Sequence, residues 1–296
     1  MVRLVSGGRG GGYARWRGLM ESVLRVAYRG DWPARLWGAL PAAGSLSTVR
    51  LKLPLPPGGG GPCRIAFVSD LHVGPTTPMA LLEKGFEAIR REEPDVLLLG
   101  GDYVFLDATA DRLRALSALV ASVACPVKLA VLGNHDLWTD DRAIVEALSR
   151  GGAKVLVNEA VALPDAWSEV VVLGLDDPWT GACDPAAAAA QMNGEPVRIV
   201  LCHSPDGLKK LTPLRFDLFL CGHTHGGQIA APWGPIVLPE GRLCVRYPSG
   251  LGRYDSGVVF VSRGLGTVEL PMRTFARPDV VLVDLVREER SEIGNR

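Results

Sequence analysis

Short apolar runs alternate with segments of helical periodicity from about residue 64 onward. The runs are rich in Val, Ile and Leu, as expected of strands that are buried on both faces of a sheet. They cover residues 64–69, 96–99, 127–132, 170–173, 197–202, 218–221, 258–262 and 280–283, and residues 46–53 are a candidate for an earlier strand.

Helical spacing of apolar residues fills the intervals between several of these runs. It covers residues 78–93, 111–123 and 140–150, and residues 184–192 contain an alanine run of high helix propensity. After residue 221 the chain becomes rich in Gly and Pro, which predicts hairpins and loops. The alternation of strands and helices predicts an α/β domain, to which we assign residues 45–296.

A basic amphipathic segment precedes this domain. Its apolar residues recur on one helical face, and they are Trp16, Leu19, Met20, Val23, Leu24 and Ala27. Residues 1–50 carry eight arginines and two acidic residues, a net charge of +6, so the rest of this neutral chain carries −6. We predict an amphipathic helical arm over residues 1–44 that binds an anionic membrane surface. In the alternative, this helix docks on the domain as an ordinary amphipathic cap.

Composition also bears on location and partners. No stretch reaches the roughly 18 to 20 uncharged apolar residues of a spanning helix, and no apolar leader opens the chain. The six cysteines are widely spaced without a Cys-x-x-Cys pair, which favours reduced, buried side chains. We expect a cytoplasmic protein that is peripheral at the inner face of the membrane where its arm binds. The acidic domain argues against nucleic acid as a partner.

All five histidines lie at or just after the end of a predicted strand, in short polar motifs. Carboxylate and amide residues accompany them there. Together these residues are Asp70, His72, Asp102, Asn134, His135, Asp136, His203, His223 and His225. Turns and caps explain any single motif of this kind, but they do not explain why every histidine occupies such a position.

The residue types indicate a metal site. Side chains two positions apart on an extended segment point the same way, so Asp70 converges with His72 and His223 with His225. The carboxyl ends of strands bring ligands from distant parts of the sequence together. Carboxylate, imidazole and amide donors without thiolates suit Mn, Fe or Zn. Seven such donors exceed the need of one tetrahedral ion and are sufficient for two ions that share a carboxylate.

The ordered motifs resemble those of the calcineurin-like metallophosphoesterases over about residues 45–286. They are Asp70-x-His72, Gly101-Asp102, Gly133-Asn134-His135-Asp136, His203 and Gly222-His223-x-His225. The sequence around Tyr103, Pro205, Gln228 and Thr267 is similar to the bacterial branch of membrane-associated phosphodiesterases, which includes an enzyme that cleaves UDP-2,3-diacylglucosamine.

The resemblance implies a four-layer α/β/β/α sandwich of two mixed sheets with a dimetal site at the strand ends. It assigns the first ion to Asp70, His72 and His225, and the second to Asn134, His203 and His223. It makes Asp102 the bridging ligand and His135 the catalytic histidine, oriented by Asp136.

The leading hypothesis is a metal-dependent hydrolase of a phosphodiester or diphosphate bond with two divalent ions, manganese being favoured. Its substrate would be lipid-linked, such as UDP-2,3-diacylglucosamine. The alternative is a soluble phosphodiesterase for nucleotides or other small phosphoesters. A non-catalytic interaction module on the same fold would have lost ligands, and none is lost. The apolar loop 229–239, with Trp233, is a candidate wall of a lipid groove or a simple hairpin.

Overall fold

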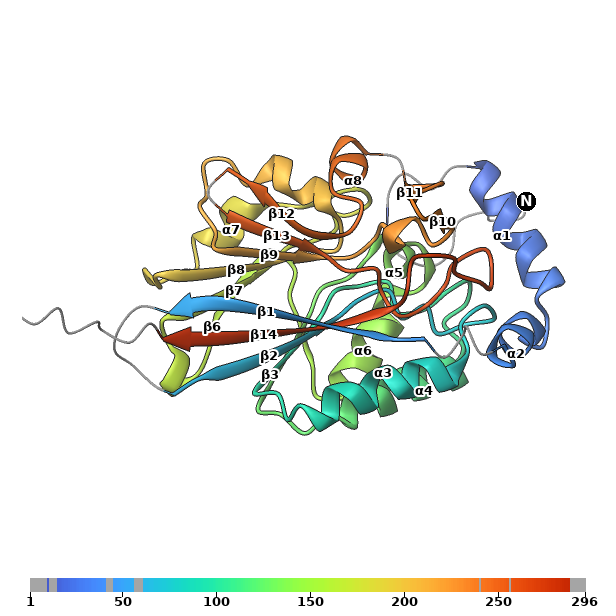
Figure 1. The fold of residues 1–296 in the computed structure, drawn as a ribbon, viewed down its shortest axis with the longest axis horizontal. Coiled ribbons are helices and arrows are strands. Elements are labelled where there is room, and N and C mark those ends of the chain that lie inside the picture. Colours follow the sequence, from blue (N-terminus) through green and yellow to red (C-terminus); the bar gives the residue numbers. More distant parts are fainter. Residues whose placement is uncertain are drawn as a thin grey trace, which may run out of the picture.

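Two six-stranded mixed sheets pack face to face, with helices on both outer faces (Figure 1). The computed structural model describes residues 10, 15–40, 45–55, 61–239, 241–255 and 257–287. One apolar core lies between the two sheets, and a further core lies between each sheet and the helices that cover it. The predicted α/β/β/α sandwich of two mixed sheets is therefore confirmed.

The first sheet has the strand order β1-β14-β2-β3-β4-β5. Strand β14 is antiparallel to β2, and the other neighbours are parallel. The strands are β1 (Ser47–Leu55), β2 (Cys63–Val68), β3 (Val96–Leu99), β4 (Val127–Ala130), β5 (Lys154–Val155) and β14 (Asp279–Arg287). The beginning and end of the domain are thus joined side by side through β1 and β14.

The second sheet has the strand order β12-β13-β9-β8-β7-β6. Its four inner strands are parallel, and each outer strand is antiparallel to its neighbour. The strands are β6 (Glu159–Ala162), β7 (Val170–Gly174), β8 (Val197–Leu201), β9 (Leu218–Cys221), β12 (Gly250–Tyr254) and β13 (Gly257–Val261).

Helices cover the outer face of each sheet. The first sheet is covered by α3 (Met79–Arg91), α4 (Ala110–Ala121) and α6 (Asp141–Arg150), and the second by α7 (Pro185–Ala189), α8 (Arg242–Arg246) and the 3₁₀ helix η3 (Pro205–Lys210). The remaining elements are α1 (Arg15–Ala27), α2 (Trp32–Gly38), α5 (Asn134–Thr139), β10 (Ala230–Ala231), β11 (Gly234–Pro235), η2 (Asp165–Trp167) and η4 (His225–Gly227). Helices α1 and α2 and the β10–β11 hairpin lie at one end of the long axis of the molecule (Figure 1).

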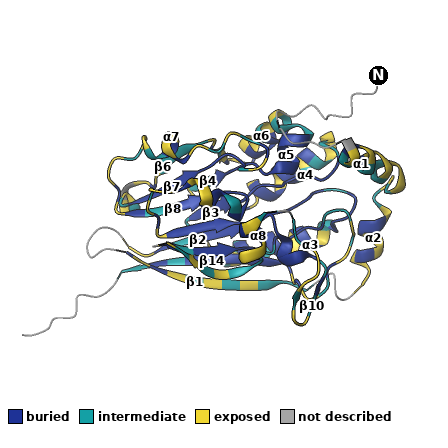
Figure 2. Ribbon diagram, turned by 90° about the horizontal axis from the view of Figure 1, so that it is seen from above, coloured by how far each residue is buried: buried dark blue, intermediate teal, exposed yellow. Residues whose placement is uncertain are grey.

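Burial on both faces explains the uniformly apolar strands. In β2, Ile65 and Phe67 face the second sheet, whereas Ala66 and Val68 face the helices, and all four are fully buried. Figure 2 shows the contrast between the mostly buried strand β2 and the more exposed strand β1. Edge strand β1 instead alternates between exposed and partly buried positions along its first six residues. The uniform runs follow from coverage of both sheet faces.

The predicted elements are found in place, with shifted ends. The predicted strand 127–132 stops at Ala130, because the chain then turns toward α5, a short helix that the sequence pattern did not predict. The loop 229–239 contains the two-stranded hairpin β10–β11. The predicted boundary between residues 44 and 45 adjoins residues 41–44, which lie outside the described residues.

Candidate metal centre

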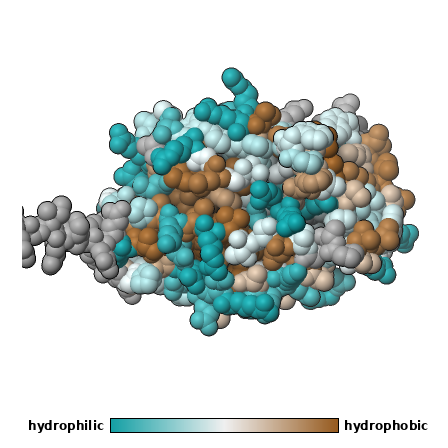
Figure 3. All heavy atoms as spheres, viewed as in Figure 1, coloured by the Kyte–Doolittle hydropathy of each residue, from teal (hydrophilic) through white to brown (hydrophobic). Residues whose placement is uncertain are grey.

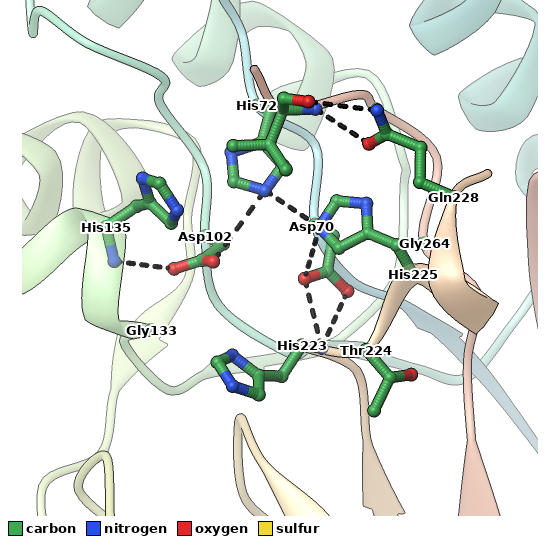
Figure 4. Close-up of polar contacts among 12 residues, drawn as sticks. Asp70, His72, Asp102, Gly133, His135, His223, Thr224, His225, Gln228 and Gly264 are labelled. Atoms are coloured by element: carbon green, nitrogen blue, oxygen red, sulfur yellow. Dashed lines mark hydrogen bonds and ion pairs between the residues drawn. The ribbon is translucent and has the colours of Figure 1, made fainter. Parts of the chain in front are cut away.

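The predicted ligands of the first ion lie together, as do two predicted ligands of the second ion and the predicted bridging residue. Their ligand atoms form two sets, each with all atoms within 4.8 Å of one another. The first set is Asp70, His72 and His225, and the second is Asp102, His203 and His223. In the first sheet, Asp70 and His72 follow β2, and Asp102 follows β3. In the second sheet, His203 follows β8, and His223 and His225 follow β9. Figure 4 shows the side chains of the two sheets gathered in one site. The centre therefore lies where parallel strands of both sheets end.

Asp102 lies between the two sets. Its Oδ2 is 3.1 Å from Nε2 of His203 in the second set and 3.7 Å from Nε2 of His72 in the first. Its Oδ1 accepts a hydrogen bond of 2.9 Å from the backbone N–H of His135 (Figure 4). One carboxylate oxygen thus faces donors of both sets, which is the arrangement required of a bridging ligand.

Five of the proposed ligands have a left-handed backbone. Asp70, His72, Asp102, His223 and His225 have φ between 43° and 71°, a conformation that costs energy for residues other than glycine. The close turn after β9 also depends on Gly222, because a Cβ there would overlap Asp70 Oδ2 and Ser69 Oγ. The strained turns place Asp70 and His72 in one donor set but divide His223 and His225 between the two sets, so the predicted convergence of His223 with His225 on one point is wrong, because neither residue lies on an extended segment.

Backbone and side-chain partners orient the imidazoles. Nδ1 of His203 lies 2.8 Å from the carbonyl oxygen of Gly100 and donates to it in the tautomer that leaves Nε2 toward Asp102. The buried guanidinium of Arg273 donates to the backbone carbonyl of His225 at 3.2 Å and also to the carbonyls of Gly266 and Ala276. Arg273 thereby ties the loop after β13 to the metal-ligand loop.

Burial shifts the pKa values of the ligands. It lowers the pKa of His72 to about 4 and that of His223 to about 3, so both rings are neutral at neutral pH. Burial raises the pKa of Asp70 to about 6. It would also lower the pKa of His203, but the neighbouring Asp102 carboxylate raises that pKa to about 10. A cation bound by Asp102 and His203 would therefore compete with a proton held between these two side chains.

The residues fit a pair of divalent cations. Nε2 of His72 lies 3.1 Å from Nε2 of His225, and two neutral imidazole nitrogens at this distance suit a shared ion. Oδ1 of Asn134 and Nε2 of His223 are buried without hydrogen-bond partners among the described residues. We propose that Asn134 adds its amide oxygen to the second set. When bound, two such cations supply an activated water and neutralise charge on the attacked phosphate.

Asp136 has partners other than the expected one. Its buried carboxylate accepts hydrogen bonds from the backbone N–H groups of Asp102, Tyr103 and Gly133, at 2.7 to 2.9 Å. It fixes the turn that carries Asp102 against the turn that carries Asn134. Asp136 is thus a positioning residue for these two turns, whereas the family resemblance implied that it orients the ring of His135.

His135 lies beside both donor sets without belonging to either. Its ring packs edge-on against His72 and Trp138, with ring centroids 4.9 and 5.5 Å away. Its Nε2 lies 3.0 Å from a guanidinium nitrogen of Arg17, on helix α1. Sequence reasoning did not identify Arg17 or Arg273 as site residues. Arg17 was visible only as one of many arginines in the arm, and no motif marked Arg273.

Comparisons with known proteins relate this chain to phosphoesterases. The family model described as calcineurin-like phosphoesterase matches residues 63–227. The chain is 31% identical over 248 residues to phosphodiesterase YaeI of Escherichia coli (strain K12), covering 82% of this chain and 89% of that protein. It is 27% identical over 261 residues to UDP-2,3-diacylglucosamine pyrophosphatase LpxG of Chlamydia trachomatis serovar D, covering 69% and 78%. A solved 5'-nucleotidase precursor from Thermus thermophilus is similar with a TM-score of 0.46 and 16% identity, covering 76% of this chain and 54% of that one.

The sandwich and its paired sets of donors define the class of metal-dependent phosphoesterases with a dinuclear centre. The family match covers more than half of the chain, and it includes the motifs from Asp70 to His225. The chain therefore belongs to the calcineurin-like phosphoesterase family, and it is an enzyme.

Proposed function

We propose that this phosphoesterase hydrolyses a phosphodiester or diphosphate bond in a lipid-linked substrate, such as UDP-2,3-diacylglucosamine, at the cytoplasmic face of a membrane. The observation that carries this proposal is the orientation of helix α1. The helix docks beside the metal centre through charged side chains and presents apolar side chains to solvent.

The inward face of α1 is polar. Arg17 and Glu21 have side-chain exposures of 16% and 6%, and Arg25 donates to Asp107 Oδ1 at 2.7 Å and to the Leu106 carbonyl at 3.0 Å. The outward face carries Trp16, Leu19, Val23 and Val26, which are 58% to 77% exposed. An amphipathic cap would bury these residues, so their orientation favours the membrane-binding alternative.

More apolar side chains are exposed at the same end of the molecule. They lie on α2, on the β10–β11 hairpin and its flank, and on the segment 270–275, and they are Trp32, Leu36, Leu40, Trp233, Ile236, Val237, Leu270, Met272 and Phe275. Hydrophobic residues gather over α1 and α2 at the right of Figure 3. Clustered exposed apolar residues are typical of interaction surfaces. Trp233 lies in the β10–β11 hairpin and is exposed, and its role as the wall of a lipid groove stays a prediction.

The surroundings of this surface support a lipid bilayer as its partner. Arg29 and Arg35 are exposed beside the apolar residues of α1 and α2, and such basic residues attract anionic headgroups. We propose peripheral attachment through the exposed face of α1. No described helix is long and apolar enough to cross a bilayer. The two LpxG relatives, whose names give UDP-2,3-diacylglucosamine as substrate, support a substrate of this kind.

The first prediction concerns membrane binding. The double variant Leu19→Ser/Val23→Ser is expected to bind anionic liposomes at least about tenfold more weakly. The reason is that two apolar side chains no longer gain free energy by moving from water into the bilayer. Sedimentation with vesicles of mixed anionic and zwitterionic lipid measures the effect. The matched control, Leu251→Ser/Val245→Ser, replaces side chains that are 67% and 64% exposed on other elements. Equal binding by both variants would contradict the proposed surface.

The second prediction concerns the substrate. In a hydrolysis panel with Mn, Mg and Zn, manganese is expected to support the highest activity, because the donors are carboxylates, imidazoles and an amide. Turnover of UDP-2,3-diacylglucosamine in mixed micelles should exceed that of bis-p-nitrophenyl phosphate and of a cyclic nucleotide. Activity on the small esters alone would favour the soluble phosphodiesterase instead.

A further inference from the structure

Helix α1 brings an arginine to the edge of the metal centre. Arg17 turns inward, and its Nη2 lies 3.0 Å from Nε2 of His135. Its guanidinium carbon lies 4.4 Å from the ring centroid of Trp138. The arm thus contributes a cation beside the histidine that lies next to both donor sets, although the arm is remote in sequence from every metal-ligand motif.

Two acidic residues fix the direction of this guanidinium. Nε lies 3.2 Å from Glu21 Oε1, one helical turn further along α1, and Nη2 lies 3.2 Å from Glu269 Oε1. The loop that carries Glu269 is itself held, because Tyr28 donates to the Glu269 carbonyl and Gln228 donates to the carbonyl of Leu270. Within the described part of the chain, Nη1 of Arg17 has no hydrogen-bond partner.

His135 is a poor hydrogen-bond acceptor for Arg17 compared with a phosphoryl oxygen. A guanidinium only donates hydrogen bonds, so Nε2 of His135 must accept from it. A ring in that state has no proton on Nε2 to give to another group. An oxygen of a phosphoryl group is a better acceptor for the guanidinium, since the hydrogen bond is then charge-assisted and its geometry matches the guanidinium fork. Exchange of partners would also release Nε2 of His135.

We propose that Arg17 binds a non-bridging oxygen of the substrate phosphoryl group, so that helix α1 completes the active site. The outer face of α1 is then apolar, and its inner face supplies a phosphate-binding residue. The ligand class is an anionic phosphoryl group. This inference rests on the phosphoester chemistry of the family and is independent of whether the substrate carries a lipid.

The test measures phosphate binding apart from turnover. Calorimetric titration of the manganese-loaded full-length protein with inorganic phosphate is expected to give a dissociation constant about tenfold larger for Arg17→Ala. Manganese content should stay unchanged, because Arg17 belongs to neither donor set. KM for bis-p-nitrophenyl phosphate should rise by a similar factor. Arg17→Lys, which keeps the charge without the fork, is expected to lie between the wild type and Arg17→Ala.

Arg29→Ala is the matched control. Arg29 is exposed two residues beyond the end of α1, and its removal also deletes one positive charge from the arm. It should keep phosphate affinity within twofold of the wild type. An equal loss in both variants would assign the effect to the overall charge of the arm and overturn the proposal, as would phosphate affinity within twofold of the wild type in Arg17→Ala. Neither probe contains a lipid, so failure of the lipid hypothesis leaves this test unaffected.

Discussion

Replacement of Asp102 by alanine is expected to abolish tight binding of both metal ions at once and to reduce kcat by at least about a thousandfold. Oδ2 of Asp102 faces Nε2 of His72 in one donor set and Nε2 of His203 in the other. Metal ions contribute several kcal/mol to transition-state stabilisation, and each 1.36 kcal/mol corresponds to about tenfold in rate. Loss of any other single ligand should weaken chiefly the ion of its own set.

Metal analysis after dialysis, together with turnover of bis-p-nitrophenyl phosphate, measures this effect. His225→Ala is the comparison for a ligand of the first set alone, and Asp284→Ala removes a carboxylate on β14 that pairs with Arg64 outside the centre. Circular dichroism of the metal-free proteins shows whether the fold persists. Full metal content and full turnover in Asp102→Ala would contradict the bridging role.

The sandwich could be predicted largely from apolar runs, because strands covered on both faces leave no polar positions. The order of the strands within each sheet could not be predicted from these runs. Strand β14 lies between β1 and β2, and pairing of this kind depends on contacts between segments more than 200 residues apart along the chain. Local patterns carry no information on such contacts, so only the family resemblance implied the two mixed sheets.

The residues of the two donor sets could be predicted because each follows an apolar run in a short polar motif. The surroundings of the site could not be predicted in the same way. The partners of Asp136 are backbone N–H groups, which no sequence motif distinguishes. Periodicity likewise predicted an amphipathic α1 but not which face turns inward. The charged face is turned inward because Arg17 forms an ion pair with Glu269 of the domain and Arg25 forms one with Asp107.

Replacement of His135 by alanine is expected to keep both metal ions and to lower kcat by about a hundredfold, the usual contribution of general acid–base catalysis. His135 belongs to neither donor set, and we propose that its Nε2 protonates the leaving group. Burial lowers the pKa of this ring, and the charge of Arg17 adds to the effect. A bound phosphate would offset that charge and raise the pKa of the ring, which favours proton uptake by His135 in the presence of substrate.

A series of substrates with leaving groups of different basicity distinguishes proton donation by His135 from electrostatic stabilisation of the transition state. A general acid matters most when the departing group is a strong base, so the loss in His135→Ala should be larger for phenyl than for p-nitrophenyl esters. His135→Gln, which keeps a polar side chain without an acid of suitable pKa, should show the same trend. Arg17→Ala retains the imidazole and should lose activity evenly across the series. Loss of a metal ion from His135→Ala would instead make His135 a ligand, and an even loss across the series would exclude proton donation to the leaving group.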